Sequence, residues 1–166
     1  DKLNLNIQDA RLHTNSEDNS FDVFYVLDVD GAPVGGNTFS SNQICSSLQR
    51  AILNPASIDF NIKRRTPRQL KSFTKQTTAK FKMDANTNSS WLEVVTPDRP
   101  GLLSRLANIF FRFNLRVMTA KISTLGERVE DVFHLTDASR RPIADNDLVR
   151  RVEKTICDEL GDVGQT

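Results

Sequence analysis

The chain is poor in the residues from which metal, redox and membrane functions are built. Its 166 residues include two cysteines and two histidines, and nothing around Cys45 or Cys157 has metal-ligand or redox spacing. We expect both to be buried or half-buried thiols in a reducing compartment. No apolar run approaches the roughly 18 residues that a membrane span needs, so we expect a cytoplasmic protein.

The chain also lacks an excess of charge of either sign. Lysine and arginine number 22 and aspartate and glutamate 21, and the net charge of +1 predicts no particular partner. No Gly-Lys-Ser/Thr phosphate loop occurs. His13 and His134 fall in expected strands, apart from any serine or cysteine with which they could form a nucleophilic pair. The sequence therefore offers no catalytic residues.

What the sequence does contain is an internal repeat. Residues 5–14 match residues 115–124 in character, and 22–33 then match 131–142 after the loss of one loop residue. Two copies of one supersecondary unit are therefore present. The second copy has a strand and a helix in front that the first lacks. We therefore expect an incomplete first copy, in a chain that is a C-terminal piece of a longer protein. Because this copy lacks a strand and a helix, its sheet should expose an apolar face and an unpaired edge.

Hydrophobic periodicity predicts the elements of both copies. In the second copy we expect strands at 91–96, 117–124 and 129–136, a helix at 102–113, and a further helix capped by Asp145. In the first copy we expect strands at 6–14 and 21–30 and a helix at 41–54, with Ser40 as its cap and Pro55 as its stop.

The order strand, helix, strand, strand, helix is that of a ferredoxin-like βαββαβ unit without its last strand. Residues 77–83 alternate in polarity and precede a turn, so a hairpin would place them antiparallel to 91–96, in the missing position. We predict an α+β fold of tandem ferredoxin-like units, permuted to ββαββα. The predicted parts are 1–54 (first unit, incomplete), 55–75 (connector), 76–160 (second unit) and 161–166 (tail).

The connector is rich in positive charge. Between Asn61 and Lys75 it has no acidic residue and six cations: Lys63, Arg64, Arg65, Arg68, Lys71 and Lys75. A solvated linker along an acidic surface is the simpler interpretation, and a strip that contacts nucleic acid is the alternative. Phe60 and Phe73 are too few aromatics to favour base stacking.

A short turn, Asp98 to Gly101, begins the helix of the second copy. Asp98 could cap that helix through the amide of Gly101, and the free amides at a helix start suit a carboxylate. An amino acid brings a carboxylate and an ammonium, and Asp98 or Thr119 could meet the ammonium. Alternatively, Asp98 is only a cap and Gly101 only a packing glycine.

Two aspartates recur at matching positions in strands, where an acid is disfavoured. Asp22 and Asp131 therefore share a task. We expect a structural one, such as bonding the hairpin or pairing with Arg11 and Lys121, rather than acid–base chemistry.

The segment 98–103, Asp-Arg-Pro-Gly-Leu-Leu, followed by 120–133, resembles an ACT domain. More specifically, the run 126–133 is similar to the paired ACT domains at the C-terminus of the bifunctional uridylyltransferase/uridylyl-removing enzymes that modify the PII signal protein. The resemblance covers nearly the whole chain, connector included. It fails at the front of the first copy, where the strand, turn and helix are absent.

The resemblance implies a bacterial regulatory module in nitrogen regulation that senses glutamine and controls catalytic domains upstream in the same chain. Those domains would be a nucleotidyltransferase that uses UTP and Mg²⁺ on PII, whereas this chain would hold no cofactor. The implied ligand-binding residues are Asp98, Arg99, Pro100, Gly101, Leu102, Leu103, Met118, Thr119, Gln8 and Asp9. The alternatives are a nucleic-acid-binding module built on the connector and a ligand-free assembly domain.

Overall fold

The computed structural model describes residues 3, 5–28, 30–34, 41–54, 76–84, 89–126 and 128–161. Along the chain its elements are β1 (Asn6–Thr14), β2 (Ser20–Leu27), α1 (Ser41–Leu53), β3 (Thr78–Asp84), β4 (Ser89–Pro97), α2 (Leu102–Arg112), β5 (Arg116–Leu125), β6 (Arg128–Thr136) and α3 (Asn146–Gly161).

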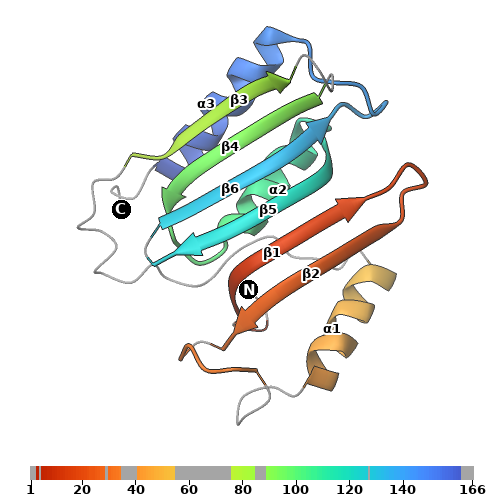
Figure 1. Cartoon of the computed structure of the whole chain (residues 1–166), viewed down its shortest axis with the longest axis vertical. Coiled ribbons are helices and arrows are strands. Elements are labelled where there is room, and N and C mark those ends of the chain that lie inside the picture. The colour runs from red at the N-terminus through yellow and green to blue at the C-terminus, as the bar shows by residue number, and fades with distance from the viewer. Residues whose placement is uncertain are drawn as a thin grey trace.

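The strands form one antiparallel sheet in the order β2-β1-β5-β6-β4-β3. Figure 1 shows α2 and α3 behind this sheet, with the opposite face open and α1 beside the outer strand β2. The second copy is an α+β, ferredoxin-like unit, as predicted. Its permutation is confirmed too, because β3 pairs antiparallel with β4, with Thr78 opposite Val95.

The core lies between α2, α3 and the strands of the second copy. Alternate side chains of β6 face the helices. Among them, the ring of Phe133 packs edge to face against the ring of Phe110 in α2, with ring centroids 5.1 Å apart. From α3, Val152, Ile156 and Leu160 are all fully buried. Each such side chain contributes roughly 1.5–3 kcal/mol of burial free energy. Most of the hydrophobic stabilisation therefore resides in the second copy.

The cap predicted for the last helix is confirmed. Oδ1 of Asp145 accepts hydrogen bonds from the amides of Asp147 (2.8 Å) and Leu148 (3.2 Å). These bonds satisfy two of the four amides that a helix start leaves without partners.

In the first copy the second strand ends earlier than predicted, at Leu27 rather than Asp30. The reason is a side-chain turn: Oδ1 of Asp28 accepts the amides of Asp30 (3.0 Å) and Ala32 (2.8 Å). Such a turn competes with strand pairing. The predicted roles of Ser40 and Pro55 and the whole basic connector lie outside the described residues.

The first copy exposes apolar surface that the second copy covers. Phe24 and Phe133 occupy the same position of the repeat, yet Phe24 is 47% exposed and Phe133 is 5% exposed. The helix α1 has no buried residue. Within the described ranges, β2 pairs on one side with β1 and has no strand on the other. The expected apolar face and unpaired edge are therefore both present.

The two thiols differ from each other. Cys157 is half-buried, as expected, but Cys45 on α1 is exposed, so the expectation for Cys45 was wrong. Among the described residues, α1 has no buried side chain, whereas the equivalent helix α3 buries its apolar side.

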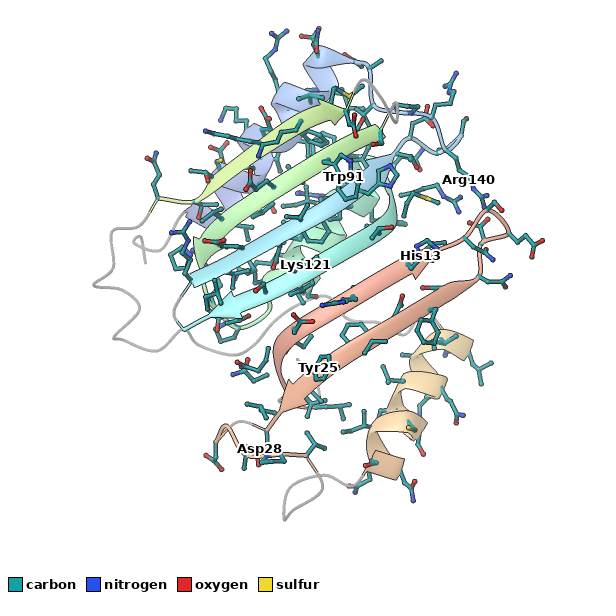
Figure 2. All side chains as sticks on the ribbon, viewed as in Figure 1. His13, Tyr25, Asp28, Trp91, Lys121 and Arg140 are labelled. Carbon is teal, nitrogen blue, oxygen red and sulfur yellow. The ribbon has the colours of Figure 1, made fainter. Side chains whose placement is uncertain are left out.

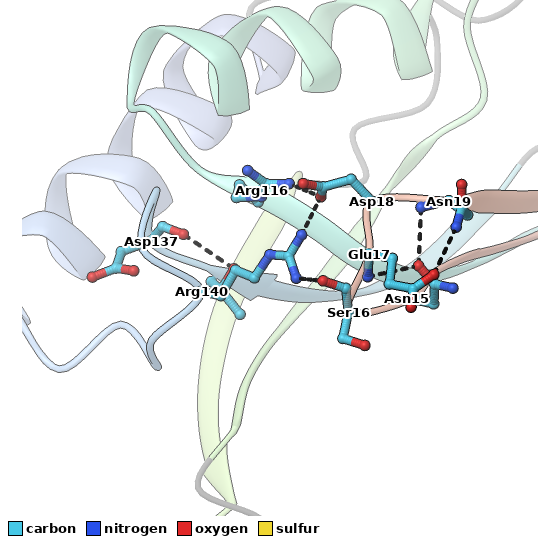
Figure 3. A network of polar contacts seen from close by, with 9 residues as sticks. Asn15, Ser16, Glu17, Asp18, Asn19, Arg116, Asp137 and Arg140 are labelled. Atoms are coloured by element: carbon cyan, nitrogen blue, oxygen red, sulfur yellow. Dashed lines mark hydrogen bonds and ion pairs between the residues drawn. The ribbon is translucent and has the colours of Figure 1, made fainter.

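The two copies are joined by strand pairing between β1 and β5, with Arg11 opposite Lys121. An ionic cluster adds to this joint at one end of the sheet (Figure 3). There Asp18, in the turn between β1 and β2, forms ion pairs with Arg116 and Arg140, the latter at 2.6 Å. Lys121 and His13 lie on the open face of the sheet (Figure 2).

Candidate functional site at the turn before helix α2

The turn between β4 and α2 leaves the start of that helix uncapped by any side chain. Gly101 occupies the N-cap position with φ of 77°, in the left-handed region that favours glycine. The predicted cap by Asp98 is therefore wrong: its carboxyl takes a backbone hydrogen bond from Arg99 instead. The amide of Leu102 donates to the carbonyl of Arg99 at 3.3 Å, and no side chain caps the start of α2. The amides that follow and the positive end of the helix dipole suit an anionic group of a ligand.

The two charged residues of the turn are turned away from water to different degrees. Asp98 is half-buried, and burial raises the pKa of its carboxyl. Arg99 is 6% exposed, and its Nη2 donates to Oγ1 of Thr96 at 3.4 Å. Nε of Arg99 is buried and has no hydrogen-bond partner among the residues that the structure describes, and burial lowers the pKa of the guanidinium. The side chain of Arg99 therefore points into the protein, whereas the sequence analysis predicted that it contacts a ligand.

A second acid, Asp131 of β6, is fully buried near this turn. Its Oδ1 accepts a hydrogen bond from the amide of Ser123 at 3.2 Å, and its Oδ2 is buried with no partner in the described part of the chain. Burial raises the pKa of Asp131 to about 7, and the charge of Asp98 adds to the shift. The bond to Ser123 confirms the expected hairpin role.

The alternative pairing of the two recurring acids with Arg11 and Lys121 is wrong. Asp131 shares the helix-covered face of β6 with Phe133, whereas Lys121 is exposed on the open face. Sequence reasoning treated Asp131 as structural only. The strand period could have shown its position, because Val129, Phe133 and Leu135 alternate in step with it.

The turn lies at the same end of the sheet as the beginning of β1. Arg128 is the register partner of both Pro97 and Leu125, and the hydroxyl of Thr124 donates to the carbonyl of Ile7 at 3.3 Å. The structure thus brings the start of the first copy's strand to the end where the second copy's turn lies.

The remaining residues predicted to bind the ligand lie in different places in the structure. Gln8 and Asp9 lie at the turn's end of the sheet, whereas Met118 and Thr119 lie toward the other end, where Oγ1 of Thr119 is 3.4 Å from Nδ1 of His13. Pro100 is partly exposed in the turn. Leu102 is buried in the core and Leu103 packs against it.

Both copies have a β-bulge at the same position of the repeat. One register shift lies between Ile7 and Asp9, and the other between Val117 and Thr119. Bulges redirect side chains and occur next to functional sites more often than elsewhere in sheets. Gln8 and Met118, both predicted to bind ligand, are the residues at these shifts.

Three other kinds of functional feature would be a surface hollow, a metal site and a membrane-spanning helix. A hollow of about 390 Å³ lies beside Pro97 and Arg128, but it contains none of the predicted ligand-binding residues. Among the described residues, no group of three His, Cys, Asp or Glu side chains could hold a metal ion. No helix in the same ranges is long and apolar enough to cross a membrane.

Comparison with known proteins agrees with this fold. Residues 90–152 match the family model described as the ACT domain, so this part of the chain is similar to ACT domains. Nearly the whole chain is in turn similar to bifunctional uridylyltransferase/uridylyl-removing enzymes, of which it matches a fragment.

The enzyme of Pseudomonas aeruginosa (strain UCBPP-PA14) is 46% identical over 160 residues, which are 96% of this chain and 18% of that protein. The enzyme of Azotobacter vinelandii (strain DJ / ATCC BAA-1303) is 44% identical over 162 residues, 98% of this chain and 18% of that protein. The chain thus spans 18% of the length of these relatives. No solved structure gives a significant match.

Proposed function

We propose that this chain is the amino-acid-sensing regulatory module of a uridylyltransferase/uridylyl-removing enzyme, with glutamine as its ligand. The ligand's carboxylate binds the uncapped amides at the start of α2, and the rest of the ligand lies between the turn of the second copy and the start of β1. The observation that carries this proposal is that the turn lies at the same end of the sheet as the start of β1, with β5 and β6 between them.

Two structural features support a ligand at this place. Gly101 has no side chain and a left-handed backbone, so a ligand can approach the helix amides closely. The bulge at Gln8 disrupts the regular ladder near the start of β1, at the same end of the sheet as the turn.

Regulation would follow from differential binding. A ligand that contacts both copies stabilises the arrangement in which its two contact surfaces are closest, and it shifts the population toward that arrangement. Catalytic domains of the same polypeptide, acting on PII, would respond to this shift. The Mg²⁺ that the resemblance implies would serve those domains, since the described residues of this chain offer no cluster for it.

Calorimetric titration of the 166-residue chain with L-glutamine tests the proposal. The wild type should bind, and Gly101→Val should bind at least tenfold more weakly because its side chain obstructs the amides. Gly31→Val is the matched control, since Gly31 has φ of 78° and open space around it. Both variants carry the same backbone strain, but only Gly101→Val should lose binding.

Two results would contradict the proposal. One is the absence of glutamine binding by folded wild-type protein at millimolar concentration. The other is equal binding by Gly101→Val and Gly31→Val. The nucleic-acid alternative rests on the basic connector, which lies outside the described residues, and no described feature favours it.

A further inference from the structure

Two buried polar atoms of opposite character have no partner within the described residues: Oδ2 of Asp131 and Nε of Arg99. Buried polar groups in native proteins are nearly always hydrogen-bonded, so each exception calls for an explanation. These two atoms are not hydrogen-bonded to each other. Asp131 is the more unusual of the two, because a fully buried carboxyl is rarely left with a free oxygen.

The matching residue of the first copy behaves differently. Asp22 is exposed, and its Oδ1 accepts the hydroxyl of Ser20 at 2.6 Å. The repeat alone therefore does not demand a buried acid with a free oxygen. That property belongs to the copy that contains the turn Asp98–Gly101 and the uncapped helix.

We propose that Asp131 is a ligand-binding residue whose Oδ2 receives the ammonium group of the amino acid held at the start of α2. This inference rests on the proposed function and adds to it a residue that binds the ammonium group of the ligand. A free amino acid carries its negative and positive groups close together. The uncapped amides of α2 and the free oxygen of Asp131 offer the complementary pair.

The surroundings of Asp131 favour a cation. The charged group that acts on it is the Asp98 carboxyl, while its register partner on β4 is the apolar Val94 and its hydrogen-bond donor is the Ser123 amide. Burial raises the pKa of both carboxyls. An ammonium between them would offset the repulsion and restore the ionised form of Asp131, which releases its proton to solvent.

The contact would also connect the ligand to the joint between the copies. Oδ2 of Asp131 is closed to water, so a ligand reaches it only when the turn or a neighbouring side chain shifts. Oδ1 is bonded to the amide of Ser123, and Ser123 is the register partner of Asp9 on β1. A displacement of Asp131 therefore acts on the strand pair that joins the two copies.

A ligand-and-variant cycle tests this inference with the 166-residue chain. L-glutamine is compared with 4-carbamoylbutanoate, which has the same carboxylate and amide but no ammonium, on wild type and Asp131→Asn. The wild type should bind glutamine at least tenfold more tightly than the analogue. Asp131→Asn should lose most of this preference, and Asp22→Asn, the matched control, should keep it.

Proton release gives a second measurement that needs no variant. Titrations of the wild type with glutamine at pH 7 in buffers of different ionisation enthalpy should show about half a proton released from Asp131 per ligand bound, because a group with a pKa of about 7 is half protonated at that pH. The affinity should fall as the pH drops below about 7. Asp98→Asn should reduce the release only in part, since Asp131 remains.

The outcomes separate the two proposals. No glutamine binding by the wild type overturns the proposed function. Binding that Gly101→Val abolishes but that shows no ammonium preference, or no proton release, overturns the role of Asp131 alone. If Asp131→Asn does not fold, the wild-type proton release decides.

Discussion

Arg11 on β1 and Lys121 on β5 are register partners across the joint, and they are also the same position of the two copies. The pairs on either side, Ala10 with Ile122 and Leu12 with Ala120, exchange when the copies are exchanged. An approximate twofold axis therefore passes between Arg11 and Lys121. The same twofold axis relates the two copies of the repeat and the two strands that join them.

This symmetry places two like charges opposite each other on the open face. Their outer neighbours across β2 and β6 are Val23 and Val132, so no acid compensates directly. Like charges in this position destabilise a sheet. Lys121→Glu should raise the free energy of unfolding by about 0.5 kcal/mol, and so should Arg11→Glu. The double variant restores the repulsion and should return to the wild-type value, as measured by urea unfolding. Additive gains in the double variant would contradict this.

Phe24 and Phe133 give a second matched comparison. Phe133→Ala should cost about 3–5 kcal/mol, because it removes a buried ring that packs on Phe110. Phe24→Ala should cost about 1 kcal/mol or less, since its ring is half exposed. Thermal or urea unfolding measures both. An equally large cost at Phe24 would mean that this face is covered in solution, by association with another molecule.

The buried acid predicts a pH dependence of stability. The pKa of Asp131 is raised from 3.8 to about 7 by folding, so its contribution is fully present below about pH 4 and is lost as pH rises to about 7. Between pH 4 and pH 8 the free energy of unfolding of Asp131→Asn should therefore increase relative to that of the wild type, by at most about 4 kcal/mol. Urea unfolding across this range measures the gain. A pH-independent difference for Asp131→Asn would contradict the assignment.

The cluster at the other end of the joint predicts a titration of opposite sign. The pKa of Asp18 lies below its usual value, mainly because Arg140 donates to its carboxylate, with a smaller effect of Arg116. Any stabilisation from this contact is present above the usual pKa and is lost as pH falls. In Arg140→Ala the pKa of Asp18, followed by NMR, should rise. Asp137, whose pKa is lowered through Arg141, is the internal control and should not move.

Much of the second copy could be predicted because its signals are local. Apolar residues repeat at helical spacing in α2 and α3, and the turn before β4 places β3 by chain geometry alone. The exposed side of the first copy followed from the repeat, since one copy lacks what the other uses to cover Phe133.

The errors concern contacts that no local pattern encodes. Asp98 has the type and spacing of a cap, but Gly101 takes the N-cap position, and Asp98 bonds to the backbone of Arg99 instead. Asp28 ended a strand early because side-chain bonding to Asp30 and Ala32 outweighed the apolar pattern. That Oδ2 of Asp131 has no hydrogen-bond partner among the described residues depends on how separate strands pack, which only coordinates reveal.

The twofold relation between β1 and β5 exists within one polypeptide, and this has a consequence for how such a module can diverge. A homodimer built on the same axis would carry every substitution twice and would separate on dilution. Here the two halves are tethered at a high effective concentration, and each is encoded separately. The residues at the two bulges already differ, Gln8 in one half and Met118 in the other. The two ends of the joint are thus free to differ in selectivity while the pairing that unites them is retained.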